Sequence, residues 1–451
     1  MKKRTIALLA ASFTLMAPLG AQTLTSGYFL EGNSLRPWLN PAFEGEHNYI
    51  AFPLGNVTLG VNSNVGVSNF LYPYNRDGYA LTTFMSSTVD ANEFLNALPQ
   101  QTRIDEHLDL TLMAIGAKTK NGYNTFNVSL HESLGFFMPK EFFELAKRGL
   151  SKETYSFSGL GAKAQAYGDI AFGHSHRVTD NLKIGGRAHL LLGIGSASVV
   201  LDKLNMNLNE TSWTAEAQAT GRLALIGNTK LTLDEDGFPE DIQFSPSINS
   251  FGLGLDLGAE YNMGNLVDGL SLSMALTDLG FVKWPTSYAI GSHEAAFEYT
   301  GLGEIDPDNM NIEEQVSEIG ESALDLMNLY FQPEGKHSTK LSPMFRLGAD
   351  YKMPFWDKMS ASLLYTKRFD KLTPYSDGRL FVNIAPLPFL ELTANVGAST
   401  YGTEFGWMFN LHPKGVQLFF GSDFAVFKVT PQYVPVNKLN ASLCMGLNIA
   451  F

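Results

Sequence analysis

The sequence predicts an all-β fold, a transmembrane antiparallel β-barrel with an amino-terminal plug and short loop helices. Three observations carry this prediction. The chain of 451 residues opens with an export-type segment, contains many stretches that alternate apolar and polar residues, and is only 17% charged. Soluble proteins usually carry about 25% charged residues, whereas a lipid-facing surface needs few. Because the mature chain has no apolar run long enough for a spanning helix, a closed barrel is the membrane fold that leaves no backbone edge unpaired.

The amino terminus resembles a secretory signal peptide. Three cations at positions 2–4 precede the apolar run 6–19, which ends in Gly20-Ala21. Cleavage after Ala21 would remove residues 1–21 from the fold. We therefore expect export to the outer membrane of a Gram-negative bacterium. Removing those three cations changes the net charge from -13 to about -16, which argues against nucleic-acid partners.

Residues 22–64 lack strand periodicity, and Pro37 and Pro41 interrupt any regular ladder. We expect a hatch or plug segment here, followed by the barrel and its loops at residues 65–451. The triplet Asn40-Pro41-Ala42 lies inside this segment. An ordinary proline turn is the alternative interpretation of the triplet.

Two short helices are predicted in the loops, at residues 90–98 and 140–148, because each begins at a capping residue and the second stops before Gly149. Their apolar faces either pack on the barrel and its plug or form a groove for an apolar ligand. The aromatic residues of that candidate groove are Phe94, Phe142 and Phe143.

Strand alternation separates an apolar face from a charged one. In the stretch 251–261, apolar residues alternate with small residues and with Asp256 and Glu260. Because a charge in lipid costs up to about 2–4 kcal/mol, both carboxylates must face the lumen. The same argument predicts lumen positions for further charges: Arg346, Asp350, Lys352 and Glu391.

The last stretch, residues 439–451, alternates an apolar face with a small or polar face and ends on Phe451. Cys444, the only cysteine, belongs to the small face and excludes an internal disulfide. The stretch resembles the closing strand of outer-membrane barrels, in which a terminal aromatic residue is the signal read by the barrel-insertion machinery. A solvent-facing strand of a soluble sandwich is the alternative interpretation.

Two segments are harder to assign. Working backward from Phe451 puts the tight turn at Asp180 on the extracellular side, which implies a miscounted strand within residues 199–247 because short turns are usually periplasmic. Residues 285–339 form a long insertion with a predicted helix at 312–330. In all, the alternating stretches amount to about 14 to 16 strands.

Two motifs resemble the FadL-type barrels of long-chain fatty-acid transport: Asn40-Pro41-Ala42, and the segment from Leu276 to Trp284 with its Thr277-Asp278-Leu279-Gly280 core. The second motif is also similar to PorV-type barrels of secretion systems, with Trp284 expected in an interfacial aromatic girdle. The resemblance implies 14 strands, a hatch and passive uptake of a hydrophobic or amphipathic molecule. It fits best an uncharacterised, lineage-specific family of such barrels, so a protein-docking barrel in secretion or assembly, or a structural barrel, is the alternative.

No catalytic motif is evident, and we expect neither an enzyme nor a cofactor. His174 and His176 lie two apart on one strand face, but no third metal ligand is indicated nearby, so no metal is expected. The expected partners are outer-membrane lipid, the insertion machinery, a hydrophobic ligand and a protein partner.

Overall fold

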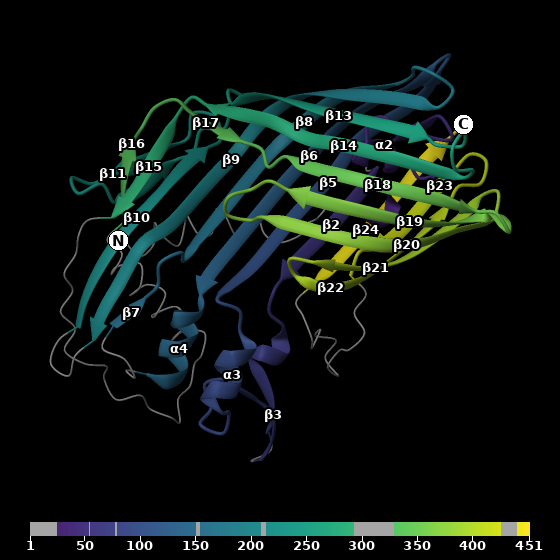
Figure 1. The fold of residues 1–451 in the computed structure, drawn as a ribbon. Helices are drawn as coiled ribbons and strands as arrows, with labels where there is room; N and C mark the ends of the chain where they lie inside the picture. Colours follow the sequence, from purple (N-terminus) through teal and green to yellow (C-terminus); the bar gives the residue numbers. More distant parts are fainter. Residues whose placement is uncertain are drawn as a thin grey trace.

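The computed structural model describes residues 25–53, 55–76, 79–149, 154–208, 213–292, 329–424 and 440–451. Within them, 14 antiparallel wall strands close into a barrel (Figure 1). Some wall strands consist of two or three labelled strands in line, which are joined by 'with' in the following order around the barrel. The wall strands are β1 (Tyr49–Ala51) with β2 (Asn56–Ser63); β5 (Gln101–Thr119); β6 (Gly122–Pro139); β8 (Gly161–Arg177); β9 (Leu182–Leu208); β10 (Trp213–Leu225) with β13 (Phe251–Asn262); β14 (Leu270–Trp284) with β15 (Ser287–Ser292); β16 (Leu329–Pro333) with β17 (His337–Lys340) and β18 (Met344–Met353); β19 (Trp356–Arg368); β20 (Tyr375–Leu387); β21 (Leu390–Ser399); β22 (Gly402–Leu411); β23 (Gln417–Ser422); and β24 (Ala441–Ala450). β24 pairs with β1 and β2, which closes the ladder.

The remaining elements are short. They are the 3-10 helices η1 (Thr25–Gly27) and η2 (Val67–Asn69), the helices α2 (Arg36–Leu39), α3 (Ala91–Ala97) and α4 (Lys140–Arg148), and the strands β3 (Leu71–Arg76), β4 (Tyr79–Thr83), β7 (Thr154–Ser156), β11 (Lys230–Leu233) and β12 (Pro239–Gln243). None of the helices in the described residues is long and apolar enough to cross a membrane.

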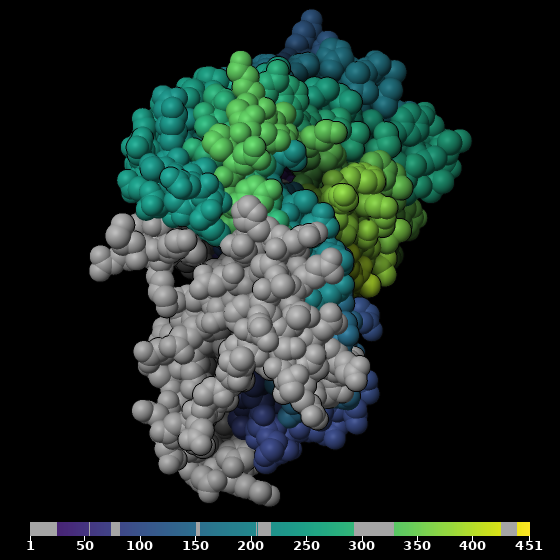
Figure 2. Space-filling model, turned by 90° about the vertical axis from the view of Figure 1, so that its left-hand side faces the viewer, coloured from purple at the N-terminus to yellow at the C-terminus, as the bar shows by residue number. Residues whose placement is uncertain are grey.

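One end of the barrel carries the short connections, at residues 120–121, 178–181, 263–269, 354–355, 388–389 and 412–416, together with the carboxy terminus; we call it the short-turn end. The opposite end, with α3, α4 and the extended parts of β9 and β10, is the long-loop end (Figure 1). Seen from the left-hand side of Figure 1, green surface residues lie between teal residues and yellow-green residues (Figure 2). Short turns are periplasmic in such barrels, which orients the molecule.

The turn at Asp180 lies at the short-turn end, so the predicted strand count was wrong within 199–247. β10 pairs with residues 195–208 of β9, and β13 pairs with residues 182–192 of the same strand. The β11–β12 hairpin is inserted between β10 and β13. β10 and β13 are therefore one wall strand that an insertion divides. Counting them as one strand puts the turn at Asp180 at the same end as the other short turns.

The alternation of side chains confirms the predicted faces. Along β13 and β24 the apolar side chains point out of the barrel: Phe251, Leu253, Leu255, Leu257, Met445, Leu447, Ile449 and Phe451 are all exposed. Asp256 and Cys444 are buried on the inner face. A chain with this apolar exterior and polar interior has the pattern that a bilayer demands of a barrel.

Trp284 is not in an interfacial girdle, which corrects the prediction. The pairing of β14 with β13 shifts register by one residue beside Asp278, whose φ is 62°. This bulge reverses the faces, because outward residues are even-numbered up to Leu276 and odd-numbered from Phe281 onward. Trp284 consequently points inward, is 1% exposed, and donates its indole N–H to Thr339 Oγ1 over 2.9 Å.

The hatch occupies the lumen but ends earlier than residue 64, where the sequence placed its boundary. Tyr49–Ala51 and Asn56–Ser63 already pair with β24 and β5 as wall strands. The two prolines that predicted an irregular segment both lie before β1. Pro37 lies in the first turn of α2, and Pro41 follows the end of that helix.

Both predicted loop helices are confirmed. Asp90 caps α3 by accepting a hydrogen bond from the Glu93 backbone over 2.8 Å, and α4 ends at Gly149, whose φ is 63°. The helix predicted for 312–330 falls outside the described residues except for Leu329 and Tyr330, which begin β16 instead. The signal segment 1–21 also lies outside them.

A charge on the outer face tests the membrane assignment. Leu363 lies mid-strand in β19 and is 53% exposed, so Leu363→Arg should lower the free energy of unfolding by about 2–4 kcal/mol. Phe355→Arg, in the turn between β18 and β19, is the matched control and should cost about 1 kcal/mol or less. Urea unfolding in lipid vesicles measures both. Equal effects at the two positions would contradict a lipid-facing β19.

Candidate functional site

The hatch helix α2 ends against two arginines of the barrel wall. The last carbonyl groups of any helix lack partners within it and need donors from outside. Arg187 donates to the carbonyls of Pro37 and Trp38, the latter over 3.2 Å. Arg346 donates to the carbonyl of Leu39 over 3.4 Å. The wall therefore supplies the donors that cap this helix.

The triplet Asn40-Pro41-Ala42 is docked on the inner wall directly after the helix. The Asn40 side-chain amide donates to the Met274 carbonyl over 3.2 Å, and its oxygen accepts from the Ala42 backbone over 3.0 Å. Gly185 and Gly258 lie beneath the triplet, and a Cβ atom at either position would collide with it. The wall is thus shaped to receive the triplet at close approach.

Above the hatch lies a chamber of about 200 Å³. Its floor is apolar and consists of Leu35, Trp38 and Leu39 from the hatch. Its wall is polar and carries charges from opposite sides of the barrel: Asp109, His131, Asp169, Arg187, His189, Asp256, Asp278 and Arg346. The chamber therefore offers an apolar surface and a charged surface to the same occupant.

The charged wall is one connected network. His189 lies between Asp169 and Asp256, with its ring nitrogens 2.9 Å and 3.1 Å from their carboxylates. Asp256 also pairs with Arg187 over 3.1 Å and accepts a hydrogen bond from the Asp278 backbone over 2.7 Å. His131 joins the network through Asp109 at 2.5 Å and Asp169 at 3.7 Å. Buried charges are tolerated only when paired in this way.

The bulge in β14 adds to this network. The unusual backbone at Asp278 brings this residue to the chamber and interrupts the β14 ladder, which pairs Thr277 with Met344 and resumes only at Phe281 with Lys340. A second, more open cavity shares Lys163, Gly254 and Leu341 with the chamber. It also includes outward-facing residues, Leu253, Leu255 and Phe281. The described wall is therefore irregular beside Asp278.

The structure places the six predicted lumen charges in two regions. Asp256 and Arg346 line the chamber. The other four do not line the chamber. Three of them contact the hatch: Glu260 pairs with Arg36 at 3.2 Å, Lys352 pairs with Glu31 at 3.2 Å, and Glu391 accepts a hydrogen bond from the Gly32 backbone at 3.0 Å. Within the wall, Glu260 also pairs with Lys183 at 2.9 Å, and Asp350 accepts a hydrogen bond from Ser362 at 2.5 Å. Most of these charges hold the hatch in place.

The sequence prediction missed the core of the network, namely Arg187, His189, Asp169 and His131. Arg187 and His189 lie on the face of β9 opposite its apolar residues. The alternation along this strand could therefore have predicted that both side chains face the lumen. No comparable sequence pattern predicted the bulge at Asp278.

The predicted groove residues form a packed cluster. Phe94 and Phe143 are buried, with ring centroids 6.4 Å apart, and Phe84 stacks on Phe94 at 4.6 Å. Phe142 is the exception, because it remains exposed and contacts Phe157 at 6.3 Å. The loop helices thus fill the space between them with their own side chains and present one aromatic ring outward.

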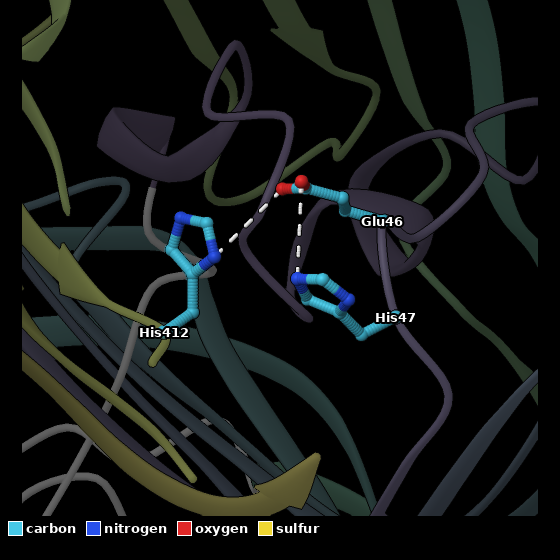
Figure 3. Close-up of side chains that lie close together, drawn as sticks. All are labelled: Glu46, His47 and His412. Atoms are coloured by element: carbon cyan, nitrogen blue, oxygen red, sulfur yellow. Dashed lines mark ion pairs between the residues drawn. The ribbon is translucent and has the colours of Figure 1, made fainter. Parts of the chain in front are cut away.

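Histidines occupy two places outside the chamber. His174 and His176 lie on the outer face of β8, with ring centroids 5.7 Å apart. Glu46, His47 and His412 meet at the short-turn end, where the hatch leads into β1 (Figure 3). Burial lowers the pKa of His412, although the Glu46 carboxylate opposes the shift, so this imidazole is neutral at neutral pH.

Several solved structures are similar to this chain over nearly its whole length. Similar solved structures include the Ralstonia pickettii toluene transporter TbuX, 9% identical with a TM-score of 0.43 over 96% of this chain and 95% of that one. The P. putida toluene transporter TodX is 9% identical, with a TM-score of 0.38 over 95% of each chain. A Pseudomonas aeruginosa FadL homologue is 10% identical, with a TM-score of 0.39 over 96% of this chain and 98% of that one.

The described residues confirm the predicted all-β barrel of 14 antiparallel strands, with the hatch in its lumen. No curated protein matches the chain. The sequence model of a family of unknown function, DUF5723, matches residues 41–423, which is most of the chain. The protein therefore belongs to this family of unknown function, DUF5723.

Proposed function

We propose that this protein is a passive outer-membrane channel for small amphipathic molecules, and that its hatch is the gate. The chamber carries this proposal, because its apolar floor and charged wall match a molecule with an apolar body and a polar group. A purely apolar occupant would leave the wall charges without solvent, whereas a purely polar one would gain nothing from Trp38 and Leu39.

The gate follows from how the hatch is held. Apolar residues of the hatch pack on the wall, as Leu35 does in one buried cluster with Met408 and Phe419. Beside this packing are hydrogen bonds and ion pairs to the wall, through Arg187, Arg346 and Glu260. Such polar contacts exchange with water or with a polar ligand group at little net cost, since each contributes only about 0.5–3 kcal/mol. A ligand in the chamber would compete for the same arginines and loosen the hatch from above.

Two features supply routes to and from the chamber. The aromatic cluster with the exposed ring of Phe142 offers an apolar surface at the long-loop end, suited to first contact with a hydrophobic molecule. The irregular wall beside Asp278 offers a passage between the chamber and the outer face of the barrel. A ligand could leave by this side or past the displaced hatch into the periplasm.

A second candidate function is a docking or structural barrel that transports nothing, acting with a protein partner in secretion or assembly. One observation favours it: in the described residues, buried ion pairs line the chamber, and the hatch docks against them. On either reading, Phe451 at the end of β24 is the residue we expect the insertion machinery to bind.

Ligand binding in the chamber can be tested by mass spectrometry of protein extracted from outer membranes. We expect one amphipathic molecule per chain in the wild type. Trp38→Ala, which removes part of the chamber floor, should reduce occupancy about tenfold or more. Trp407→Ala is the matched control, because Trp407 lies on the outer face. A wild-type protein without a small molecule but with a reproducible crosslinked protein partner would favour the docking function instead.

Hatch docking can be tested at the glycines beneath it. Gly185→Ala should displace the hatch, because the new Cβ would collide with the Pro41 carbonyl. We expect a larger ion conductance in planar bilayers than the wild type shows. Gly378→Ala is the control, since no atom lies within 4 Å of its added Cβ. Identical conductance in both variants would show that the triplet does not help to close the pore.

A further inference from the structure

We propose that Glu46, His47 and His412 form a binding site for a divalent transition-metal ion of the Zn²⁺ type, which fastens the end of the hatch to the barrel wall. One ligand atom from each residue lies within 4.8 Å of the other two. Figure 3 shows the Glu46 carboxylate between the two imidazole rings. Two histidines and one carboxylate are a common protein ligand set for zinc, with water in the fourth position.

The three ligand atoms would have to move closer together to bind an ion. His47 Nε2 lies 3.8 Å from one Glu46 oxygen, and His412 Nδ1 lies 3.7 Å from the other. Ligand atoms around a tetrahedral zinc stand about 3.4 Å apart when each bond is about 2.1 Å long. At most 4.8 Å separates any two of the three ligand atoms, so shifts of up to about 1.4 Å would bring them to this spacing around one ion.

His412 is the observation that points to a ligand. The residue is only 4% exposed, yet neither of its ring nitrogens has a hydrogen-bond partner within the described part of the chain. An unpartnered buried polar group is costly and asks for an explanation. A metal ion bound at Nδ1 would satisfy one of these nitrogens.

The surroundings of His412 support the same role. Its Nε2 faces the Glu391 carboxylate at 3.8 Å, and a closer approach would give it the carboxylate partner that the second nitrogen of a metal-bound histidine usually has. Glu391 is itself fixed by the Gly32 backbone at 3.0 Å and by Asn410 at 2.7 Å. A Cβ at position 32 would lie 2.6 Å from His412 Nε2, so a larger residue there would displace this ring.

The location explains what the ion would do. Glu46 and His47 directly precede β1, at the point where the hatch leaves the lumen, whereas His412 lies in the turn between β22 and β23. The side chains of Glu46 and His47 are 45% and 43% exposed, which leaves a path for the ion from the short-turn end. The ion would thus join two segments far apart in sequence. This proposal holds whether or not the barrel transports a ligand.

The test is isothermal titration of the full-length mature protein with ZnCl2, in detergent, after EDTA treatment and with an affinity tag that lacks histidine. We expect one site per chain. His47→Ala and Glu46→Gln should each weaken binding about tenfold or more, and His412→Ala should do the same. His47 and Glu46 are partly exposed, so circular dichroism of those two variants should show an intact barrel.

The control variant is His174→Ala with His176→Ala, which removes the other histidine pair and should leave the site unchanged. Hydrogen exchange gives a second readout: at zinc about 100-fold above its dissociation constant, amides of residues 44–48 should exchange up to about 100-fold more slowly. His47→Ala should abolish this slowing. No zinc binding by the wild type, binding that survives in His47→Ala and Glu46→Gln, or loss only in the control variant would each overturn the proposal.

Discussion

Two arginines of the barrel wall bind the carboxyl end of the hatch helix, and the arrangement of the lumen depends on them. Arg187 and Arg346 satisfy carbonyls that the four-residue helix α2 leaves open. Arg187 also stacks on Trp38, with its guanidinium 4.3 Å from the ring centroid. A buried guanidinium needs a counter-charge, which Asp256 provides at 3.1 Å. The arginines that bind the hatch, together with the carboxylate that pairs with Arg187, therefore put charges in the lumen.

The chamber is a consequence of the same constraint. The carboxylate of Asp256 extends the charge pattern through His189 to Asp169 and His131, while the hatch helix turns its apolar residues toward the space above. One side of the chamber is apolar because the hatch supplies Leu35, Trp38 and Leu39, and the other is ionic because the wall supplies the ion pairs around Asp256. The proposed gating uses the dual role of Arg187 and Arg346, which contact both hatch and chamber.

Much of the fold could be predicted from the sequence because a barrel in lipid enforces strict alternation. The outward residues of β13 and β24, the inner position of Cys444 and the lumenal Asp256 all follow from that single rule. The rule fails where the ladder is irregular. The extra residue at Asp278 reverses the faces of β14, so Trp284 turns inward, and an insertion divides one strand into β10 and β13.

The candidate site was less predictable, for a different reason. Alternation predicts that Glu260, Arg346 and Lys352 face the lumen, but not which group of the hatch each one contacts. That pairing depends on the position of the hatch, which has no periodicity. Likewise, nothing local joins Glu46 and His47 to His412, because they are brought together only by the closure of the barrel.

The central claim is that the hatch must move for a molecule to pass. Ser34 of the hatch and Asn448 of β24 are in contact, with Ser34 Oγ 2.6 Å from Asn448 Nδ2. Cysteines at both positions, combined with Cys444→Ser, would lock the hatch by a disulfide. Uptake of radiolabelled oleate should then be measured in a host lacking its own fatty-acid channel. The account predicts that oxidation reduces uptake about tenfold or more and that reduction restores it. Equal uptake in the oxidised and reduced states would contradict it.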